Sequence, residues 1–342
     1  MKKLRFAVIG TGFWANFQIP AWMELEGIEL VALYNRTISK AEAMARKFNV
    51  PGVYDDVQKL LENEKLDFVD IITDVDTHKV FTELAAKKGV AVICQKPMAP
   101  KLAIAKEMLS ASEKHKVPFF IHENWRWQAP IRKMKELLNS GIIGNPFKAR
   151  VTFCSAFPVF ENQPFLAELD EFILTDIGSH ILDVCRFLFG EAETLYCHTA
   201  SVNPKIKGED VANVLMKMEN GVSCYAEMSY ASILEYGAFP QTFILVEGEN
   251  GSLNLTEDYA IHVTTKEGTN FINATPKSYS WLDPEYAVIH SSIVDCNRDI
   301  LNELQGRGKA ETTGSDNLET VRLVHAAYHS ARNNKLILLK SF

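Results

Sequence analysis

Short apolar runs alternate with amphipathic stretches over the first third of the chain. Runs rich in β-branched and aromatic residues predict β-strands at LRFAVIG, IELVALYN, DFVDIIT, VAVIC and VPFFIH. Between them, the spacing of apolar positions predicts helices over 13–25, 37–49, 56–63, 76–88 and 100–115. Strands that alternate with helices indicate parallel strands joined by crossover helices.

The pattern changes near residue 124. A helical segment, 129–140, is followed by long strand-like runs with turn signals between several of them. We therefore expect an α/β protein of two domains. Residues 1–124 should form a doubly wound parallel sheet, and residues 125–342 an α+β domain with a mainly antiparallel sheet. The expected later elements are strands at 146–157, 193–202, 211–218, 221–231 and 241–247, helices at 285–305 and 315–333, and a final strand, KLILL.

The first predicted strand runs directly into a glycine turn, VIGTGFWA. Gly10, Gly12 and Ala15 fit G-x-G-x-x-A, in which the glycines allow a tight turn and a close approach to a pyrophosphate at a helix N-terminus. Because strand, turn, helix and second strand follow in the required order, we expect a dinucleotide site rather than a plain structural turn. The residues expected to contact the cofactor here are Gly10, Thr11, Gly12, Phe13, Trp14 and Ala15.

Two further strand ends carry candidate cofactor ligands. After the second strand, an acidic residue would bind the ribose 2′-hydroxyl of NAD, but this chain has Asn35 and Arg36. Asn35 can bind a hydroxyl without repelling a phosphate, while Arg36 can pair with a 2′-phosphate, cover the adenine or be solvated. The cofactor is therefore expected to be NAD or NADP. Lys96 follows the fifth strand, where ligands gather in a doubly wound sheet, and Pro97 restricts its backbone.

An apolar segment, ILTDIGSHILDVCRFLFG at 173–190, carries an acid–base row. If residues 176–189 form an α-helix, Asp176, His180 and Asp183 lie within roughly 60° of one another around its axis. This row is typical of a general base that a carboxylate orients. It is also typical of a helix whose N-terminus Asp176 caps, with the imidazole of His180 hydrogen-bonded to a carboxylate one turn away. We expect Asp183 to have a structural role.

Charge and composition exclude several partners. The 342 residues carry a formal net charge of −7, which argues against nucleic acid and anionic membranes as partners. No apolar run has the length of a membrane span, and the start, MKKLRFAVIG, is interpreted as a strand rather than a secretory signal. The six cysteines are scattered without a C-x-x-C pair, which predicts reduced thiols in a cytoplasmic protein.

Together the motifs resemble one oxidoreductase family. The glycine motif, Thr73 followed by His78, the K-P after the fifth strand, N-x-R-x-x-x-P from Asn124 and D-x-x-x-H-x-x-D from Asp176 are similar to the Gfo/Idh/MocA family. The likeness continues through GEDVANVLMKMENG and SDNLETVRLVHAAYHSARNN, and so covers almost the whole chain. It implies a Rossmann domain, a C-terminal α/β domain with an open, mainly antiparallel sheet, and oxidation or reduction of a sugar or polyol with NAD(P). It also implies a homodimer or homotetramer.

The resemblance assigns roles to individual residues. The family's catalytic lysine matches Lys96, and its Asp/His pair matches Asp176 and His180. Trp125 and Trp127 are either a wall for a sugar ring or part of an aromatic core. Further cofactor contacts are expected from Thr73, His78, Gln95 and Lys96, and substrate contacts from Asn124, Trp125, Arg126, Trp127, Gln163, Asp176 and His180.

Two positions depart from the family pattern. Gln95 stands where the family has Glu, which removes a negative neighbour from the lysine, and Asp74 stands where it often has Pro. Within the family, the segments ICQKP, HENWRWQAPI, FENQPFLAE and GED are most similar to members that oxidise D-apiose.

The expected function is an NAD(P)-dependent sugar or polyol dehydrogenase, with His180 as base, Asp176 orienting it and Lys96 stabilising charge on the substrate oxygen. Hydride transfer needs no metal, and the pair His325 and His329 lacks the glutamate of H-E-x-x-H, so no metal is expected. Two alternatives remain at this point: a non-catalytic dinucleotide-binding regulator, and an enzyme that recycles hydride on tightly bound NAD.

Overall fold

The first compact unit of the protein is built on a parallel sheet. The structure, a computed structural model, describes residues 3–235 and 239–342. Its first unit comprises the residues up to Asn124 together with 280–282 and 293–321. The strand order is β3-β2-β1-β4-β5-β6 and every pairing is parallel. This is the doubly wound order that the alternation of strands and helices predicted, and the predicted fold class is confirmed.

The strands of the first unit are β1 Leu4–Ile9, β2 Ile28–Tyr34, β3 Gly52–Tyr54, β4 Phe68–Ile71, β5 Ala91–Gln95 and β6 Phe119–His122. Its helices between these strands are α1 Ala15–Met23, α2 Ile38–Phe48, α3 Val57–Asn63, α4 Val75–Lys87 and α5 Leu102–His115.

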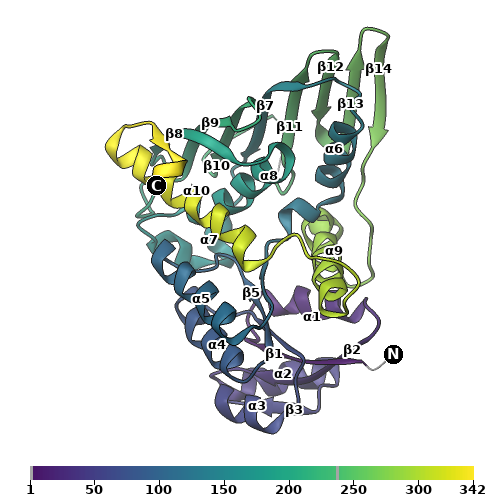
Figure 1. Ribbon diagram of the computed structural model, residues 1–342, viewed down its shortest axis with the longest axis vertical. Helices are drawn as coiled ribbons and strands as arrows, with labels where there is room; N and C mark the ends of the chain where they lie inside the picture. Colours follow the sequence, from purple (N-terminus) through teal and green to yellow (C-terminus); the bar gives the residue numbers. More distant parts are fainter. Residues whose placement is uncertain (1–2, 236–238) are drawn as a thin grey trace. The chain divides into compact units, whose positions relative to one another are not determined.

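The sheet of this unit is buried on both faces, as crossover helices require. Every residue of β4 and β5 is buried. Helices α4 and α5 lie side by side (Figure 1), and Asp56 caps α3 by accepting hydrogen bonds from the backbone of Gln58 and Lys59. Because all the strands run in one direction, the turns after β1, β4 and β5, with Gly10, Thr73 and Lys96, belong to the same edge of the sheet.

The second unit contains a mixed, mainly antiparallel sheet. It comprises residues 125–279, 283–292 and 322–342. The order is β14-β13-β12-β11-β7-β10-β9-β8-β15, in which only β7 and β10 pair in parallel among the described strands. Segments 280–282 and 293–321, which the sequence analysis placed in the second domain, belong to the first unit, and the division falls inside helices α9 and α10.

The strands of the second unit are β7 Pro146–Cys154, β8 Ala192–Ala200, β9 Val211–Met218, β10 Ser223–Ser229, β11 Phe243–Gly248, β12 Gly251–Leu255, β13 Ala260–Thr265, β14 Gly268–Asn273 and β15 Ile337–Leu338. The α-helices are α6 Ala129–Asn139, α7 Val159–Asn162, α8 Ser179–Phe189, α9 Ala287–Leu304 and α10 Gly314–Asn333. The short helices are η1 Trp125–Trp127, η2 Pro164–Glu168, η3 Leu174–Gly178, η4 Glu257–Tyr259, η5 Pro284–Tyr286 and η6 Leu339–Ser341.

Strands β12 to β14 were not expected from the sequence. Their residues are rich in Thr, Asn and Ser, and β14 is largely exposed, so no apolar run marks them. The two faces of the sheet also differ. Val151 and Ala226 are fully buried, whereas Thr152 donates to Glu227 on the opposite, more polar face. β7 and β10 therefore carry one apolar face and one more polar face.

None of the helices in the described part of the chain combines the length and the apolar character of a membrane span. The six cysteines, all among the described residues, form no disulfide.

Candidate active site

The glycine turn after β1 contains two glycines with different surroundings. Gly10 has a φ of +113°, and a Cβ there would lie 2.3 Å from the carbonyl oxygen of Ile72. Only glycine therefore fits at this position. A Cβ at Gly12 would meet no described atom within 4 Å, so the side-chain space at Gly12 is open toward a ligand. With α1 beginning at Ala15, these residues fit a pyrophosphate at the N-terminus of the helix.

Asn35 connects the ends of two strands. Its Nδ2 donates to Oγ1 of Thr11 at 2.8 Å, and its Oδ1 accepts from the backbone N–H of Thr37 at 2.8 Å. The side chain thus holds the turn after β2 against the glycine turn. Arg36 next to it is exposed, and Phe13 is 55% exposed. The contacts of these residues with a cofactor stay predictions.

His78 is a brace between the turns after β4 and β5. It is 1% exposed, and its ring nitrogens lie 3.1 Å from the carbonyl oxygen of Thr73 and 3.2 Å from that of Pro97. Burial lowers the pKa of this imidazole. The brace fixes the turn that carries Lys96, whose side chain is half-buried. The cofactor contact predicted for His78 stays a prediction.

The acid–base row begins in a π-helical turn. Asp176 lies in η3, which is a π-helix, and His180 lies in α8 immediately after it. The expected single α-helix over 176–189 is therefore wrong at its start. Sequence spacing does not reveal a π-helix, because one extra residue per turn leaves the apolar pattern intact over so short a stretch. Turns of this kind occur frequently at functional sites.

Glu209 holds the segment that leads into the π-helix. Its carboxylate accepts hydrogen bonds from the backbone N–H groups of Phe172 at 3.3 Å and Leu174 at 3.4 Å. The hydroxyl of Tyr328 donates to the same carboxylate at 2.8 Å and accepts from the backbone of Thr175 at 3.1 Å. These bonds satisfy orphan backbone donors where the helix begins.

Aromatic side chains fix Asp176 and His180. The hydroxyl of Tyr230 donates to Oδ2 of Asp176 at 3.3 Å. Burial, and then the Asp176 charge, raise the pKa of Tyr230 well above its usual value. The ring of Trp125 stacks on His180 with centroids 4.2 Å apart and planes at 21°, and its indole N–H donates to Thr242 at 3.0 Å. Trp125 therefore packs as a buried support for the imidazole, and its predicted contact with the substrate stays a prediction.

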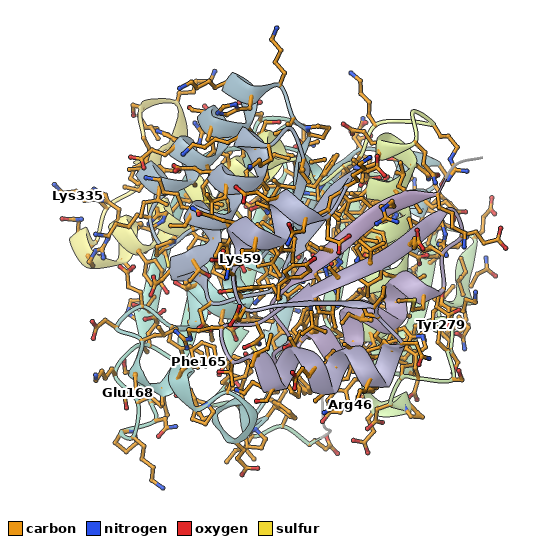
Figure 2. The ribbon with its side chains drawn as sticks, turned by 90° about the horizontal axis from the view of Figure 1, so that it is seen from below. Arg46, Lys59, Phe165, Glu168, Tyr279 and Lys335 are labelled. Atoms are coloured by element: carbon orange, nitrogen blue, oxygen red, sulfur yellow. The ribbon has the colours of Figure 1, made fainter. Side chains whose placement is uncertain are left out.

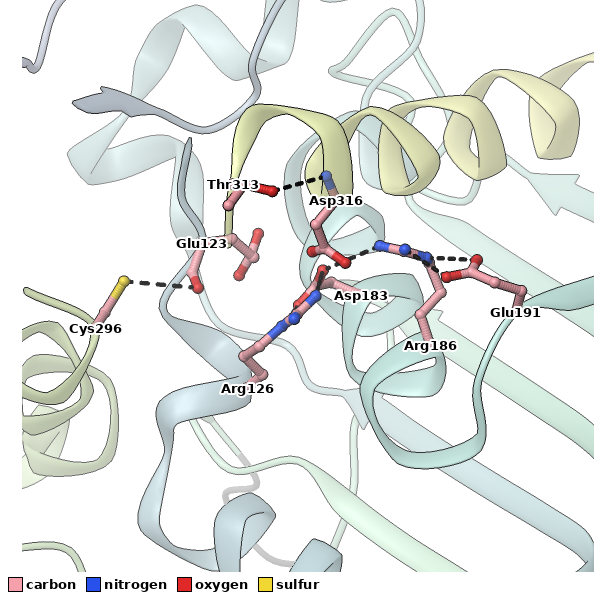
Figure 3. A network of polar contacts seen from close by, with 8 residues as sticks. All are labelled: Glu123, Arg126, Asp183, Arg186, Glu191, Cys296, Thr313 and Asp316. Carbon is pink, nitrogen blue, oxygen red and sulfur yellow. Dashed lines mark hydrogen bonds and ion pairs between the residues drawn. The ribbon is translucent and has the colours of Figure 1, made fainter. Parts of the chain in front are cut away.

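Arg126 pairs with Asp183 inside the second unit. Its Nε and Nη2 donate to the two carboxylate oxygens at 2.7 and 2.6 Å. Arg186 lies 3.8 Å from the same carboxylate and pairs at 2.6 Å with Glu191 (Figure 3). Removing one partner of a buried pair costs about 3–5 kcal/mol. Asp183 thus has the structural role that was expected, while the substrate contact predicted for Arg126 stays a prediction.

The other predicted substrate residues differ in exposure. Asn124 and Trp127 are buried, and the guanidinium of Arg132 lies 4.2 Å above the Trp127 ring. Gln163 is half-buried between α7 and η2. Phe165, which follows Gln163 in the chain and is labelled in Figure 2, lies in η2 and is exposed, at 61%. Within the described residues, no group of three or more His, Cys, Asp or Glu side chains is arranged to hold a metal ion.

Three residues that shape this site were not predicted from the sequence. Glu209 lies in the GED segment, which was noted only as a likeness, and Tyr230 and Tyr328 had no signal of their own. Their hydrogen bonds join residues far apart in the chain, so only the folded sheet and helices bring them together.

Comparison with known proteins gives matches over both units. A family model described as an oxidoreductase family with an NAD-binding Rossmann fold, GFO_IDH_MocA, matches residues 4–123. The model of the GFO/IDH/MocA C-terminal domain matches residues 131–254.

Similar proteins cover nearly the whole chain. A D-apiose dehydrogenase of Paraburkholderia graminis is 42% identical over 341 residues, which are 100% of this chain and 91% of that protein. One from Rhizobium rhizogenes is 40% identical over 98% of each chain. A crystal structure of an oxidoreductase from Agrobacterium radiobacter, in complex with NAD+, L-tartaric acid and magnesium, is 39% identical and superposes with a TM-score of 0.97 over 99% of each chain.

Proposed function

This chain belongs to the Gfo/Idh/MocA oxidoreductase family and is an NAD-dependent sugar dehydrogenase, and we propose that its substrate is D-apiose or a closely similar branched aldose. The observation that carries this proposal is the identity of 42% and 40% to two D-apiose dehydrogenases over essentially the full chain. More distant relatives that act on inositols are 24–25% identical over 60–68% of this chain.

We assign the chemistry to Lys96, Asp176 and His180. The carbinol carbon loses a hydride, its hydroxyl loses a proton, and a carbonyl forms. Bound NAD supplies the hydride acceptor. His180 takes the hydroxyl proton, because histidine is the side chain best suited to proton transfer near neutral pH. Asp176, held by the Tyr230 hydroxyl at 3.3 Å, stabilises the protonated imidazole, and Lys96 donates a hydrogen bond to the substrate oxygen as negative charge develops.

The test of this function is a screen of cofactor reduction. Purified protein is mixed with NAD or NADP and with D-apiose, other branched pentoses, common aldoses and inositols. D-Apiose with NAD should give the highest specificity constant. A clear preference for an inositol or an unbranched aldose would overturn the substrate assignment. Tightly bound nucleotide without net reduction would indicate hydride recycling instead.

A further inference from the structure

A chain of hydrogen bonds runs from a fully buried carboxylate to the end of β5. Oδ2 of Asp70, in β4, accepts from Nε2 of Gln18 at 2.8 Å and from the indole N–H of Trp22 at 2.7 Å. Oε1 of Gln18 in turn accepts from Nε2 of Gln95 at 2.5 Å and from the indole N–H of Trp14 at 3.1 Å. Asp70 and Gln18 have no exposed surface, and Gln95 is 8% exposed.

The groups at the two ends of this series of hydrogen bonds determine which atom donates and which accepts in each bond. An ionised carboxylate only accepts hydrogen bonds and an indole N–H only donates. Gln18 must therefore turn its amide nitrogen to Asp70 and its oxygen to Trp14. Gln95 can then meet the Gln18 oxygen only with its own amide nitrogen, which leaves the Gln95 carbonyl oxygen on the opposite side of the amide. The orientation of both amides follows from the network itself.

We propose that Asp70, acting through Gln18, holds Gln95 as a fixed, uncharged hydrogen-bond acceptor next to Lys96. Asp70 and Gln18 are positioning residues, and the Gln95 carbonyl accepts from an N–H donor, either on the bound cofactor or on the Lys96 ammonium. The glutamate of the family pattern is also an acceptor, so Gln95 keeps this property without the charge. The part of the inference that concerns turnover rests on the proposed function.

The surroundings of Asp70 favour this single role. Helix α1, which supplies Gln18 and Trp22, contains no charged residue. The nearest titratable side chain on β5 is Cys94, whose thiol pKa is raised by burial and further by Asp70. Burial raises the pKa of Asp70 itself to about 6, so above that pH the carboxylate is ionised and can only accept.

The test replaces Gln95 by the residue of the family pattern. In Gln95→Glu, the inner carboxyl oxygen faces the Gln18 oxygen, and only a protonated Glu at position 95 can donate to it. The protonated form mimics Gln95, so turnover should approach the wild-type rate at low pH. Above a raised pKa of this carboxyl, turnover should fall about tenfold per pH unit, while the wild type shows no such fall. A change in the NAD dissociation constant over the same range identifies the cofactor as the donor. A change in kcat alone identifies Lys96.

A second readout does not depend on turnover. Because the introduced carboxyl has a raised pKa, the melting temperature of Gln95→Glu should fall relative to the wild type as pH rises above about 4. In Gln18→Met/Gln95→Glu the opposing oxygen is gone and only burial still raises the pKa of the introduced carboxyl, so this fall should become smaller. Thr82→Val, which removes a buried hydroxyl elsewhere in the first unit, is the control and should leave NAD affinity and turnover unchanged.

A melting-temperature difference that is independent of pH, together with pH-independent turnover of Gln95→Glu relative to the wild type, would overturn the inference. If the wild type turned over no sugar but the melting temperatures behaved as expected, the proposed function would fail and the hydrogen-bond chain would stand.

Discussion

At the scale of single residues, we propose that His180 takes the proton from the substrate hydroxyl. His180→Ala should lower kcat by about a hundredfold or more, the usual contribution of a general base, with NAD affinity little changed. Asp176→Asn should impair the same step, and the double variant should be scarcely slower than the slower single one, because the two act as a unit. Steady-state kinetics across pH checks this. Near-normal turnover of His180→Ala at every pH would remove the residue from the proton path.

Asp70 gives a second prediction at this scale, on stability. Its pKa is raised by burial from 3.8 to about 6, so the folded chain holds this proton more tightly than the unfolded chain. The stability contributed by the protonated form is lost as pH rises from about 4 to about 6. This rise in the pKa of Asp70 corresponds to about 3 kcal/mol of the free energy of unfolding. Asp70→Asn cannot ionise. Its free energy of unfolding relative to the wild type should therefore improve by about 3 kcal/mol between pH ~4 and pH ~8.

Denaturant titrations at the two pH values measure this difference. Thr82→Val provides a buried, isosteric control in the same unit, and its effect should be the same at both pH values. An Asp70→Asn effect that does not vary with pH would show that Asp70 ionises normally in the folded protein.

At the scale of elements, the turn between β1 and α1 contains Gly10, which the backbone requires, and Gly12, which we propose to lie against the cofactor. Gly12→Val adds atoms where no described atom lies within 4 Å. It should therefore weaken NAD binding by about a hundredfold or more, roughly 2.7 kcal/mol, with the melting temperature nearly unchanged. Gly10→Val forces a side chain into the carbonyl of Ile72 at a φ of +113°. The Gly10→Val substitution should lower the free energy of unfolding by about 1–3 kcal/mol.

Calorimetric titration with NAD and thermal unfolding of both variants check this contrast. Unchanged NAD affinity in Gly12→Val would place the pyrophosphate elsewhere. An unchanged melting temperature in Gly10→Val would show that the turn can relax.

The elements also show what a sequence can and cannot predict. The Rossmann sheet and its glycine turn were predictable because apolar periodicity and turn chemistry are local properties of the chain. The spacing of Asp176, His180 and Asp183 was visible in the sequence, but only the resemblance to the family assigned catalytic roles to Asp176 and His180. Its π-helical start, the stacking of Trp125 on His180 and the pairing of Arg126 with Asp183 were not predictable. They depend on packing between residues more than thirty positions apart, for which the local pattern carries no signal.

At the scale of the whole molecule, we expect a homodimer or homotetramer. Large apolar side chains are exposed on strands of the second unit's sheet: Leu215 at 50%, Phe147 at 52% and Phe271 at 69%. Burial of such side chains against a second copy would remove them from water. Sedimentation equilibrium over a range of concentrations should give a mass of two or four chains. A single monomeric species at all concentrations would contradict this.

We propose that the protein moves a hydride from D-apiose to NAD. In the most direct measurement, the protein is incubated with unlabelled NAD and with D-apiose that carries deuterium at every carbon-bound hydrogen position. The mass of the recovered cofactor is then determined by mass spectrometry. The expected result is reduced cofactor that carries one deuterium, formed in a one-to-one ratio with oxidised sugar. Reduced cofactor without deuterium, or consumption of sugar without net reduction of NAD, would contradict it.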